Sequence, residues 1–241
     1  MNDAVANVRQ SMLPDPPEVA GLSLAARSRP LGTGLHTKGD WYDFFPVAEG
    51  SLGIAMGDVV ERGLEAAIVM SHLRSAVRAA ASACGPTPGD VVASVDQVVS
   101  DTGFGTGSTL LYLVVNAASG EVRFANAGHC RPLLVLDEGS AFFVEQARSS
   151  RLGAVSGRRG ARPEATLALP LAGSLLLYTD GLLLDELHRD DARQGLSSAA
   201  AGGPRDVGRL CDHVMTRCLG GRRRRDDASL LALRLGETVQ P

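Results

Sequence analysis

A pair of aspartates at the two ends of a predicted β-hairpin constrains this chain more than any other feature. Asp40 precedes the aromatic run 41–45, and Asp58 follows the apolar run 52–56, eighteen residues further along. Both runs have the length and composition of strands, and a Glu-Gly turn signal lies between them. Antiparallel pairing of the two strands predicts that the carboxyl groups of Asp40 and Asp58 lie side by side.

The chemistry of such a pair points to a cation. An aspartate at the end of a buried strand loses hydration, which is unfavourable unless a cation or hydrogen-bond donors lie close to the carboxylate. No pair of Cys or His residues accompanies Asp40 and Asp58 in this stretch. Clustered carboxylates of this kind suit hard ions such as Mg²⁺ or Mn²⁺.

Two further aspartates stand at strand ends in the second half of the chain. Asp180 follows the apolar run 174–178, and Asp226 precedes the final apolar run 228–235, with Asp227 as an alternative to Asp226. These residues lie far apart in sequence, and only a sandwich whose strands meet at one edge collects them. The predicted cluster consists of Asp40, Asp58, Asp180 and Asp226.

The rest of the chain supplies the other layers of such a sandwich. The basic, glycine-rich segment 148–162 is predicted to be a mobile loop, whose arginines are either solvated or meet an acidic or phosphorylated partner. Residues 165–169 and 174–178 are predicted to pair as neighbouring strands. The remaining predicted elements are a strand at 21–29, helices at 65–83 and 88–99, a hairpin of 109–116 with 121–127, strands at 133–136 and 142–144, and a helical segment at 185–220.

Composition excludes several classes of protein. The chain has 241 residues, 44% of them hydrophobic, which is enough for a substantial core, and its formal charge of −3 argues against a general nucleic-acid binder. Its 4 cysteines form no CxxC pair, so reduced thiols in a cytoplasmic protein are expected. No signal peptide is visible, and the most apolar stretch, 167–178, is too short and too interrupted to cross a membrane.

Five ordered motifs carry a resemblance that covers nearly the whole chain. They are GDWYD, GDVxxxGxxAAxxM, ANAGHxxPLLV, LLLYTDGL and DDASLLALR. In this order and at these intervals they resemble the SpoIIE/RsbU-type serine phosphatases, a bacterial branch of the PPM (PP2C-like) family. The resemblance implies an α+β fold of two packed antiparallel β-sheets flanked by helices. We expect an N-terminal helix and linker over 1–20 and the phosphatase domain over 21–237.

The same resemblance implies the roles of the acidic residues. Asp58 would bridge two ions of Mn²⁺ or Mg²⁺ with help from the backbone carbonyl of Val59, and Asp40, Asp180 and Asp226 would hold the remaining positions. A water shared by the two ions would attack phosphorus directly, without a covalent phosphoenzyme. Asp40, Asp58 and Asp180 are therefore the predicted catalytic residues.

Two departures from the family pattern bear on substrate binding and activity. Val60, Glu61 and Arg62 stand where the family shows a small residue, Gly and His, and Lys38 stands where the family prefers Gly. Arg62 and Lys38 are candidate phosphate-binding cations. His129, at a strand end, is either a general acid or a hydrogen-bonded histidine of a turn.

The implied function is hydrolysis of phosphoserine or phosphothreonine on a regulatory protein. By resemblance the substrate is a STAS-type anti-sigma factor antagonist, and an activator protein and a homodimer are further possible associations. The alternative is a weak or inactive pseudophosphatase that binds a partner, which the Val-Glu-Arg replacement favours and the retention of the acids opposes. A nucleotide-binding module is disfavoured because no glycine-rich loop carries the Lys-Ser/Thr of a phosphate loop.

Overall fold

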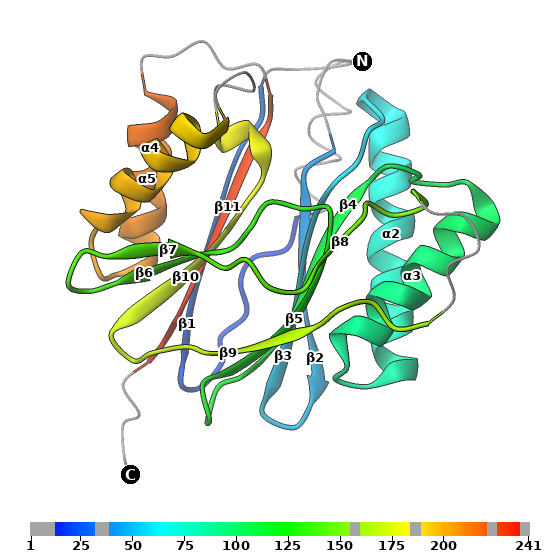
Figure 1. The fold of residues 1–241 in the computed structure, drawn as a ribbon, viewed down its shortest axis with the longest axis horizontal. Coiled ribbons are helices and arrows are strands. Elements are labelled where there is room, and N and C mark those ends of the chain that lie inside the picture. The colour runs from blue at the N-terminus through cyan, green and yellow to red at the C-terminus, as the bar shows by residue number, and fades with distance from the viewer. Residues whose placement is uncertain (1–12, 32–38, 155–159, 184–188, 221–225, 237–241) are drawn as a thin grey trace.

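Two β-sheets lie face to face in this protein, and helices cover their outer faces (Figure 1). A computed structural model describes residues 13–31, 39–154, 160–183, 189–220 and 226–236. Helices α2 (Gly63–Cys84) and α3 (Pro88–Thr102) lie on one side, and α4 (Arg189–Ala201) and α5 (Val207–Leu219) lie on the other. The predicted α+β sandwich of two sheets flanked by helices is confirmed.

The first sheet has five strands in the order β1-β11-β10-β6-β7, and the second runs β2-β3-β4-β5-β8, with β9 also paired to β5. All of these pairs are antiparallel except β5 with β8. The strands of the first sheet are β1 (Leu22–Arg29), β6 (Leu133–Leu136), β7 (Ala141–Phe143), β10 (Gly173–Tyr178) and β11 (Ala228–Leu235). Those of the second are β2 (Trp41–Ala48), β3 (Ser51–Asp58), β4 (Thr109–Asn116), β5 (Glu121–Ala127), β8 (Arg148–Ser149) and β9 (Ala165–Ala168).

The main core lies between the sheets. Strand β3 contributes Leu52, Ile54 and Met56 to this inner layer, where they pack with Leu177 of β10. Ala55, on the opposite face of β3, packs under the helices. Because β3 is buried on both faces, its sequence is a continuous apolar run instead of an alternating one.

Helix α2 is stabilised by the burial of one face. Met70, Leu73 and Val77 are buried in the cluster that also contains Trp41 of β2. The residue before the helix, Arg62, makes no side-chain capping bond, and Gly85 ends the helix with a φ of 68°. The predicted helix 65–83 is confirmed, and apolar packing accounts for it better than capping does.

The hairpin of β2 and β3 forms as predicted. Trp41 lies opposite Gly57 in the antiparallel register. A Cβ atom at Gly57 would lie 2.7 Å from the indole nitrogen of Trp41, so only glycine fits beneath this fully buried ring. The pairing places the residues just beyond it, Asp40 and Asp58, at one end of the hairpin.

Two predictions about the second half of the chain are wrong. Strands β9 and β10 do not pair, because β9 joins β5 in the second sheet while β10 lies between β6 and β11 in the first. All of β10 is buried, which suits a central strand, whereas β9 alternates half-buried and exposed residues, which suits an edge. The segment 148–162 is not simply a mobile loop, since it contains β8 and the buried Arg162.

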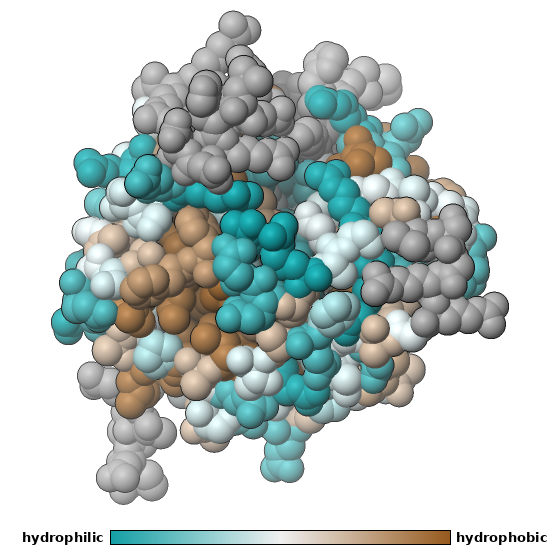
Figure 2. All heavy atoms as spheres, in the orientation of Figure 1, coloured by the Kyte–Doolittle hydropathy of each residue, from teal (hydrophilic) through white to brown (hydrophobic). Residues whose placement is uncertain are grey.

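Apolar side chains are also visible on the surface. Figure 2 shows them gathered over the part of the first sheet formed by β6, β7 and β10. Phe142 of β7 is 56% exposed and Leu171, before β10, is 67% exposed.

Some sequence predictions concern residues that the structure does not describe. Most of the predicted N-terminal helix and Lys38 lie outside the described residues. The division into 1–20 and 21–237 stays a prediction. Within the described ranges, no helix combines the length and apolar character that a membrane span requires.

Leu177→Ala is expected to lower the free energy of unfolding by about 2–5 kcal/mol, because it leaves a cavity between the sheets. The matched control is Leu171→Ala at an exposed position, for which a change within about 0.5 kcal/mol is expected. Urea unfolding followed by circular dichroism measures both. Equal losses in the two variants would contradict this description of the core.

Candidate metal centre

The predicted acids converge on one edge of the sandwich, two from each sheet. Asp40 precedes β2 and Asp58 ends β3 in the second sheet. Asp180 follows β10, at the start of a short 3₁₀ helix (Asp180–Leu182), and Asp226 precedes β11 in the first sheet. The amide of Val59 donates to the carbonyl of Gly39 at 3.3 Å, which holds the two ends of the hairpin together.

One hydrogen bond crosses from the first sheet to the second at this edge. The hydroxyl of Thr179 donates to Oδ2 of Asp40 at 2.6 Å, and both residues are buried. The same hydroxyl accepts the amide of Ser229 at 2.9 Å, which connects β10 to β11. Thr179 therefore fixes Asp40 relative to both central strands of the first sheet.

A close backbone approach brings Asp180 beside the last acidic pair. A Cβ atom built on Gly181 would lie 1.7 Å from the carbonyl oxygen of Asp227 and 3.2 Å from Cβ of Asp226. No side chain fits there without displacement of the backbone. Glycine after Asp180 is thus what allows the two acidic segments to touch.

The pKa of Asp40 reflects this crowding. Burial raises it well above its ordinary value, and repulsion from Asp58 raises it further. Asp227 and Asp226 add to the increase, while the hydrogen bond from Thr179 opposes it. The carboxylates of both sheets are therefore near enough to repel one another, and a bound cation would relieve that repulsion.

The carboxylate oxygens of these aspartates are the type of ligand that a hard divalent cation prefers. Oδ1 of Asp40 and Oδ1 of Asp180 are buried and accept no hydrogen bond. Buried carboxylate oxygens without donors are costly unless a cation is present. Among the residues that the structure describes, however, no three His, Cys, Asp or Glu side chains are already arranged around a common metal position. The acids are gathered, but their side chains are not set as a finished coordination shell.

The hydrogen bonds of Asp226 and Asp227 help to decide which of the two is the predicted metal ligand. Oδ1 of Asp227, which is buried, accepts the amide of Leu31 at 2.6 Å. Oδ1 of Asp226 accepts the amide of Asp227 itself at 2.9 Å. Because Asp227 anchors a distant segment of backbone, we keep Asp226 as the predicted ligand.

His129 belongs to a hydrogen-bonded turn. Its amide donates to Oδ1 of Asn126 at 2.8 Å, and its Nδ1 lies 2.8 Å from the hydroxyl of Thr109. Thr109 in turn accepts the amide of Asp58 at 3.1 Å. Burial lowers the pKa of His129 to about 4, so the imidazole is neutral near pH 7. Of the two predicted roles, the structural one agrees better with these contacts.

A cavity of about 120 Å³ opens beside the acids. Asp58 and Asp180 line it together with Thr109, Gly128, His129, Cys130, Arg148, Arg151, Leu183 and Arg193. Arg62, a predicted phosphate-binding residue, is exposed at the start of α2 and does not line this cavity. Val59 is fully buried directly after Asp58.

Two threonines of this region were not predicted to contribute. Thr109 and Thr179 hold Asp58 and Asp40 through the hydrogen bonds described above. In the sequence, Thr179 follows an apolar run and directly precedes Asp180 at the end of a strand. Its hydroxyl at that place is the only sequence feature that could have indicated its role. Thr109 has no such signal, because its partners are distant in sequence.

Comparison with known proteins assigns the family. The model of stage II sporulation protein E (SpoIIE) matches residues 48–236. The chain belongs to the SpoIIE family. The resemblance to SpoIIE/RsbU-type domains that the five motifs carry is therefore confirmed.

Individual relatives of this SpoIIE-family chain agree with that assignment. Phosphoserine phosphatase RsbU of Bacillus subtilis is 28% identical over 153 residues, which are 63% of this chain and 44% of RsbU. A crystal structure of RsbU and RsbW domains from Mycobacterium tuberculosis has a TM-score of 0.82 and 30% identity, covering 93% of this chain and 62% of that one.

A crystal structure of RsbX in complex with magnesium has a TM-score of 0.63 at 16% identity, covering 91% of this chain and 98% of RsbX. At this identity, the similarity concerns the fold alone. The SpoIIE-family chain thus spans less than half of the curated relative that it matches and less than two thirds of the Mycobacterium structure.

Gly181→Ala is expected to lower the free energy of unfolding by about 1–3 kcal/mol, because the added methyl group displaces the backbone of Asp227. Gly195→Ala is the matched control, since Gly195 lies in α4 with nothing within 4 Å of a built Cβ atom. That change is expected to stabilise by about 0.5–1 kcal/mol. Urea unfolding measures both, and shifts of the same sign would contradict the close approach.

Thr179→Val is expected to lower the free energy of unfolding by about 1–3 kcal/mol, because Asp40 and the amide of Ser229 both lose a buried partner. Thr179→Ser retains the hydroxyl and is expected to recover most of this loss. Thermal unfolding at neutral pH compares the two variants. A valine variant as stable as the serine variant would show that the hydroxyl contributes nothing.

Proposed function

We propose that this SpoIIE-family domain is a metal-dependent protein serine/threonine phosphatase. The observation that carries the proposal is the convergence of acids from both sheets, with buried oxygens of Asp40 and Asp180 that accept no hydrogen bond. The names of two relatives support it, since RsbU is a phosphoserine phosphatase and RsbX was crystallised with magnesium. The substrate class is the phosphoserine or phosphothreonine of a protein.

The residues that would hold two Mn²⁺ or Mg²⁺ ions are those predicted from the sequence. Asp58 and the carbonyl of Val59 come from the second sheet with Asp40, and Asp180 and Asp226 come from the first. Such ions supply Lewis acidity toward a phosphoryl group and activate water near neutral pH.

The chain's own residues orient this acidic set. Thr179 holds one oxygen of Asp40, and Thr109 holds the amide of Asp58. These bonds fix the two residues before any ion or substrate arrives, which lowers the reorganisation that binding requires. Thr109 and Thr179 are positioning residues, because each acts through an aspartate.

Direct hydrolysis agrees with the nucleophiles available. Cys130 lines the cavity, but burial and the nearby carboxylate of Asp180 raise the pKa of its thiol far above neutrality. A protonated thiol is a poor nucleophile. This supports water as the attacking group, in preference to a cysteinyl-phosphate intermediate.

The proposed substrate is a phosphorylated STAS-domain protein, an antagonist of an anti-sigma factor. Support comes from the Mycobacterium structure, in which an RsbU domain occurs together with an RsbW domain. An activator protein, a homodimer and a cytoplasmic location complete the proposal.

The pseudophosphatase alternative is not favoured. It rests on Val60, Glu61 and Arg62, and none of these lines the cavity beside Asp58 and Asp180. Val60 is 52% exposed and Arg62 is exposed, so these two residues of the replacement lie on the outer rim, whereas Glu61 is half-buried. The acids that a hydrolase requires are retained behind it.

Release of phosphate from a phosphoserine peptide with Mn²⁺ or Mg²⁺ tests the proposal. Turnover is expected in the wild type, with losses of roughly 100-fold or more in Asp58→Asn and Asp180→Asn, because each variant removes a carboxylate charge from the metal site. Chelation with EDTA is expected to abolish turnover.

The matched control is Asp90→Asn, at an exposed aspartate of α3, which is expected to keep wild-type activity. Metal binding measured by calorimetry accompanies the assay. Turnover that persists in both acidic variants, or in EDTA, would contradict the proposed centre. Bound metal without turnover would indicate a domain that awaits its activator, whereas the absence of bound metal would favour the pseudophosphatase.

A further inference from the structure

Three arginines are among the residues that line the cavity beside the acids. Asp58 and Asp180 line this cavity, and so do Arg148, Arg151 and Arg193. Arginine is the side chain best suited to bind a phosphoryl group, because its planar guanidinium donates two parallel hydrogen bonds. A cavity with metal-type acids and arginines together has both parts of a phosphomonoester site.

Arg151 is an arginine of this cavity that forms no ion pair within the described residues. Its Nη1 donates one hydrogen bond, to the carbonyl of Gly107 at 3.3 Å, and no carboxylate of the described chain pairs with it. Its side chain crosses Gly128, where a Cβ atom would lie 2.4 Å from Cγ of Arg151. Glycine at 128 therefore lets the arginine stem lie flat beside the cavity.

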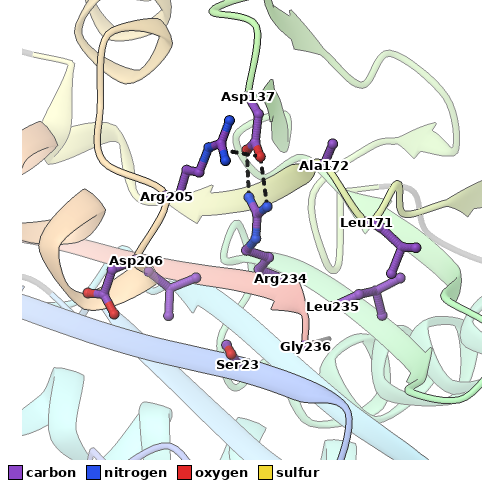
Figure 3. Close-up of a pocket in the computed structure, with 10 residues that line it drawn as sticks. Ser23, Asp137, Leu171, Ala172, Arg205, Asp206, Arg234, Leu235 and Gly236 are labelled. Carbon is purple, nitrogen blue, oxygen red and sulfur yellow. Dashed lines mark hydrogen bonds and ion pairs between the residues drawn. The ribbon is translucent and has the colours of Figure 1, made fainter. Parts of the chain in front are cut away.

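The arginines of the second cavity present a useful contrast (Figure 3). There Asp137 is held by Arg234 through two bonds of 2.7 and 2.8 Å, and Arg205 lies 3.2 Å from the same carboxylate. Both arginines are paired with the same acid, Asp137. Those arginines therefore already have a carboxylate partner, whereas Arg151 forms no ion pair within the described residues.

The backbone around Arg151 is fixed from two sides. On one side, the amide of Gly128 donates to Ser149 at 3.0 Å, and β8 runs beside the end of β5. On the other side, the amide of Leu152 donates to Ser108 at 3.0 Å, and Gly107 donates back to Leu152 at 2.8 Å. Arg151 therefore projects from a segment that is held before any ligand arrives.

A buried ion pair reinforces the same segment. Arg162 and Asp96 of α3 lie 2.6 Å apart, with side chains only 2% and 5% exposed. Arg162 also donates to the carbonyl of Ser150 at 2.6 Å, and Asp96 accepts the amide of Gly153 at 2.8 Å. Burial of such a pair is unfavourable unless its hydrogen bonds are satisfied, and here they are made to both sides of Arg151.

We propose that Arg151 binds the phosphoryl group of a phosphorylated peptide in the cavity beside Asp58 and Asp180. This inference rests on the proposed phosphatase function and names the residue that binds the substrate's phosphate. Arg148 also lines the cavity, is 54% exposed and lies 3.9 Å from Glu145, and its charge would attract the anionic substrate. The sequence analysis expected Arg62 to bind phosphate. Because Arg62 does not line the cavity, we assign this role to Arg151 instead.

Steady-state kinetics with a phosphoserine peptide and with p-nitrophenyl phosphate tests this role. In Arg151→Gln, KM for both substrates is expected to rise about 10- to 100-fold with a smaller change in kcat, because a charge-assisted bond to the phosphate is lost. Arg151→Lys is expected to recover part of the affinity. Arg205→Ala, in the other cavity, is the matched control and is expected to behave as wild type.

Equilibrium binding separates this inference from the proposed function. Fluorescence anisotropy compares the phosphorylated peptide with its unphosphorylated form on wild type and on Arg151→Gln, with thermal unfolding as the check on folding. If the wild type binds the phosphopeptide preferentially and Arg151→Gln loses this preference, but the wild type releases no phosphate, the proposed function fails and the binding role of Arg151 stands. Unchanged KM and unchanged phosphopeptide affinity in a folded Arg151→Gln protein would overturn the inference.

Discussion

The hydrogen bond from Thr179 to Asp40 is the contact on which the acidic edge of this sandwich depends. Each sheet is held internally by its own ladder of backbone bonds, but the sheets meet mainly through apolar side chains, which have no preferred direction. A directional bond of 2.6 Å between buried groups sets their relative position at one edge. Because the acids come from both sheets, their spacing follows from this contact.

The treatment of buried acids differs between this edge and the rest of the molecule. Asp43, which is 1% exposed, accepts bonds from Arg78 and Arg74, and Asp96 is paired with Arg162. Asp40 and Asp180 instead retain buried oxygens with no donor. Elsewhere the protein neutralises a buried carboxylate with arginine, and at the candidate centre it leaves room for a different cation.

Much of the fold and the acidic set follow from local sequence patterns. Apolar runs that end in aspartate identify β3 and β10, and such patterns depend only on neighbours along the chain. Which sheet receives β9 is decided by distant partners, so its pairing with β5 was not predictable from the Ala-Thr-Leu-Ala pattern. Likewise, Arg162 lies in a polar, glycine-rich stretch in which nothing marks it as buried. Its burial depends on the ion pair with Asp96, which lies on a helix far away in sequence.

The place of β11 in the first sheet has a consequence for how the protein is made. This strand lies between β1 and β10, so that sheet is incomplete until the final strand of the fold has left the ribosome. Asp226 immediately precedes that strand and reaches Gly181 only once it pairs. A nascent chain therefore carries Asp40 and Asp58 on an early hairpin without their counterparts. The acidic cluster becomes complete only after β11 has been synthesised and has paired with β1 and β10.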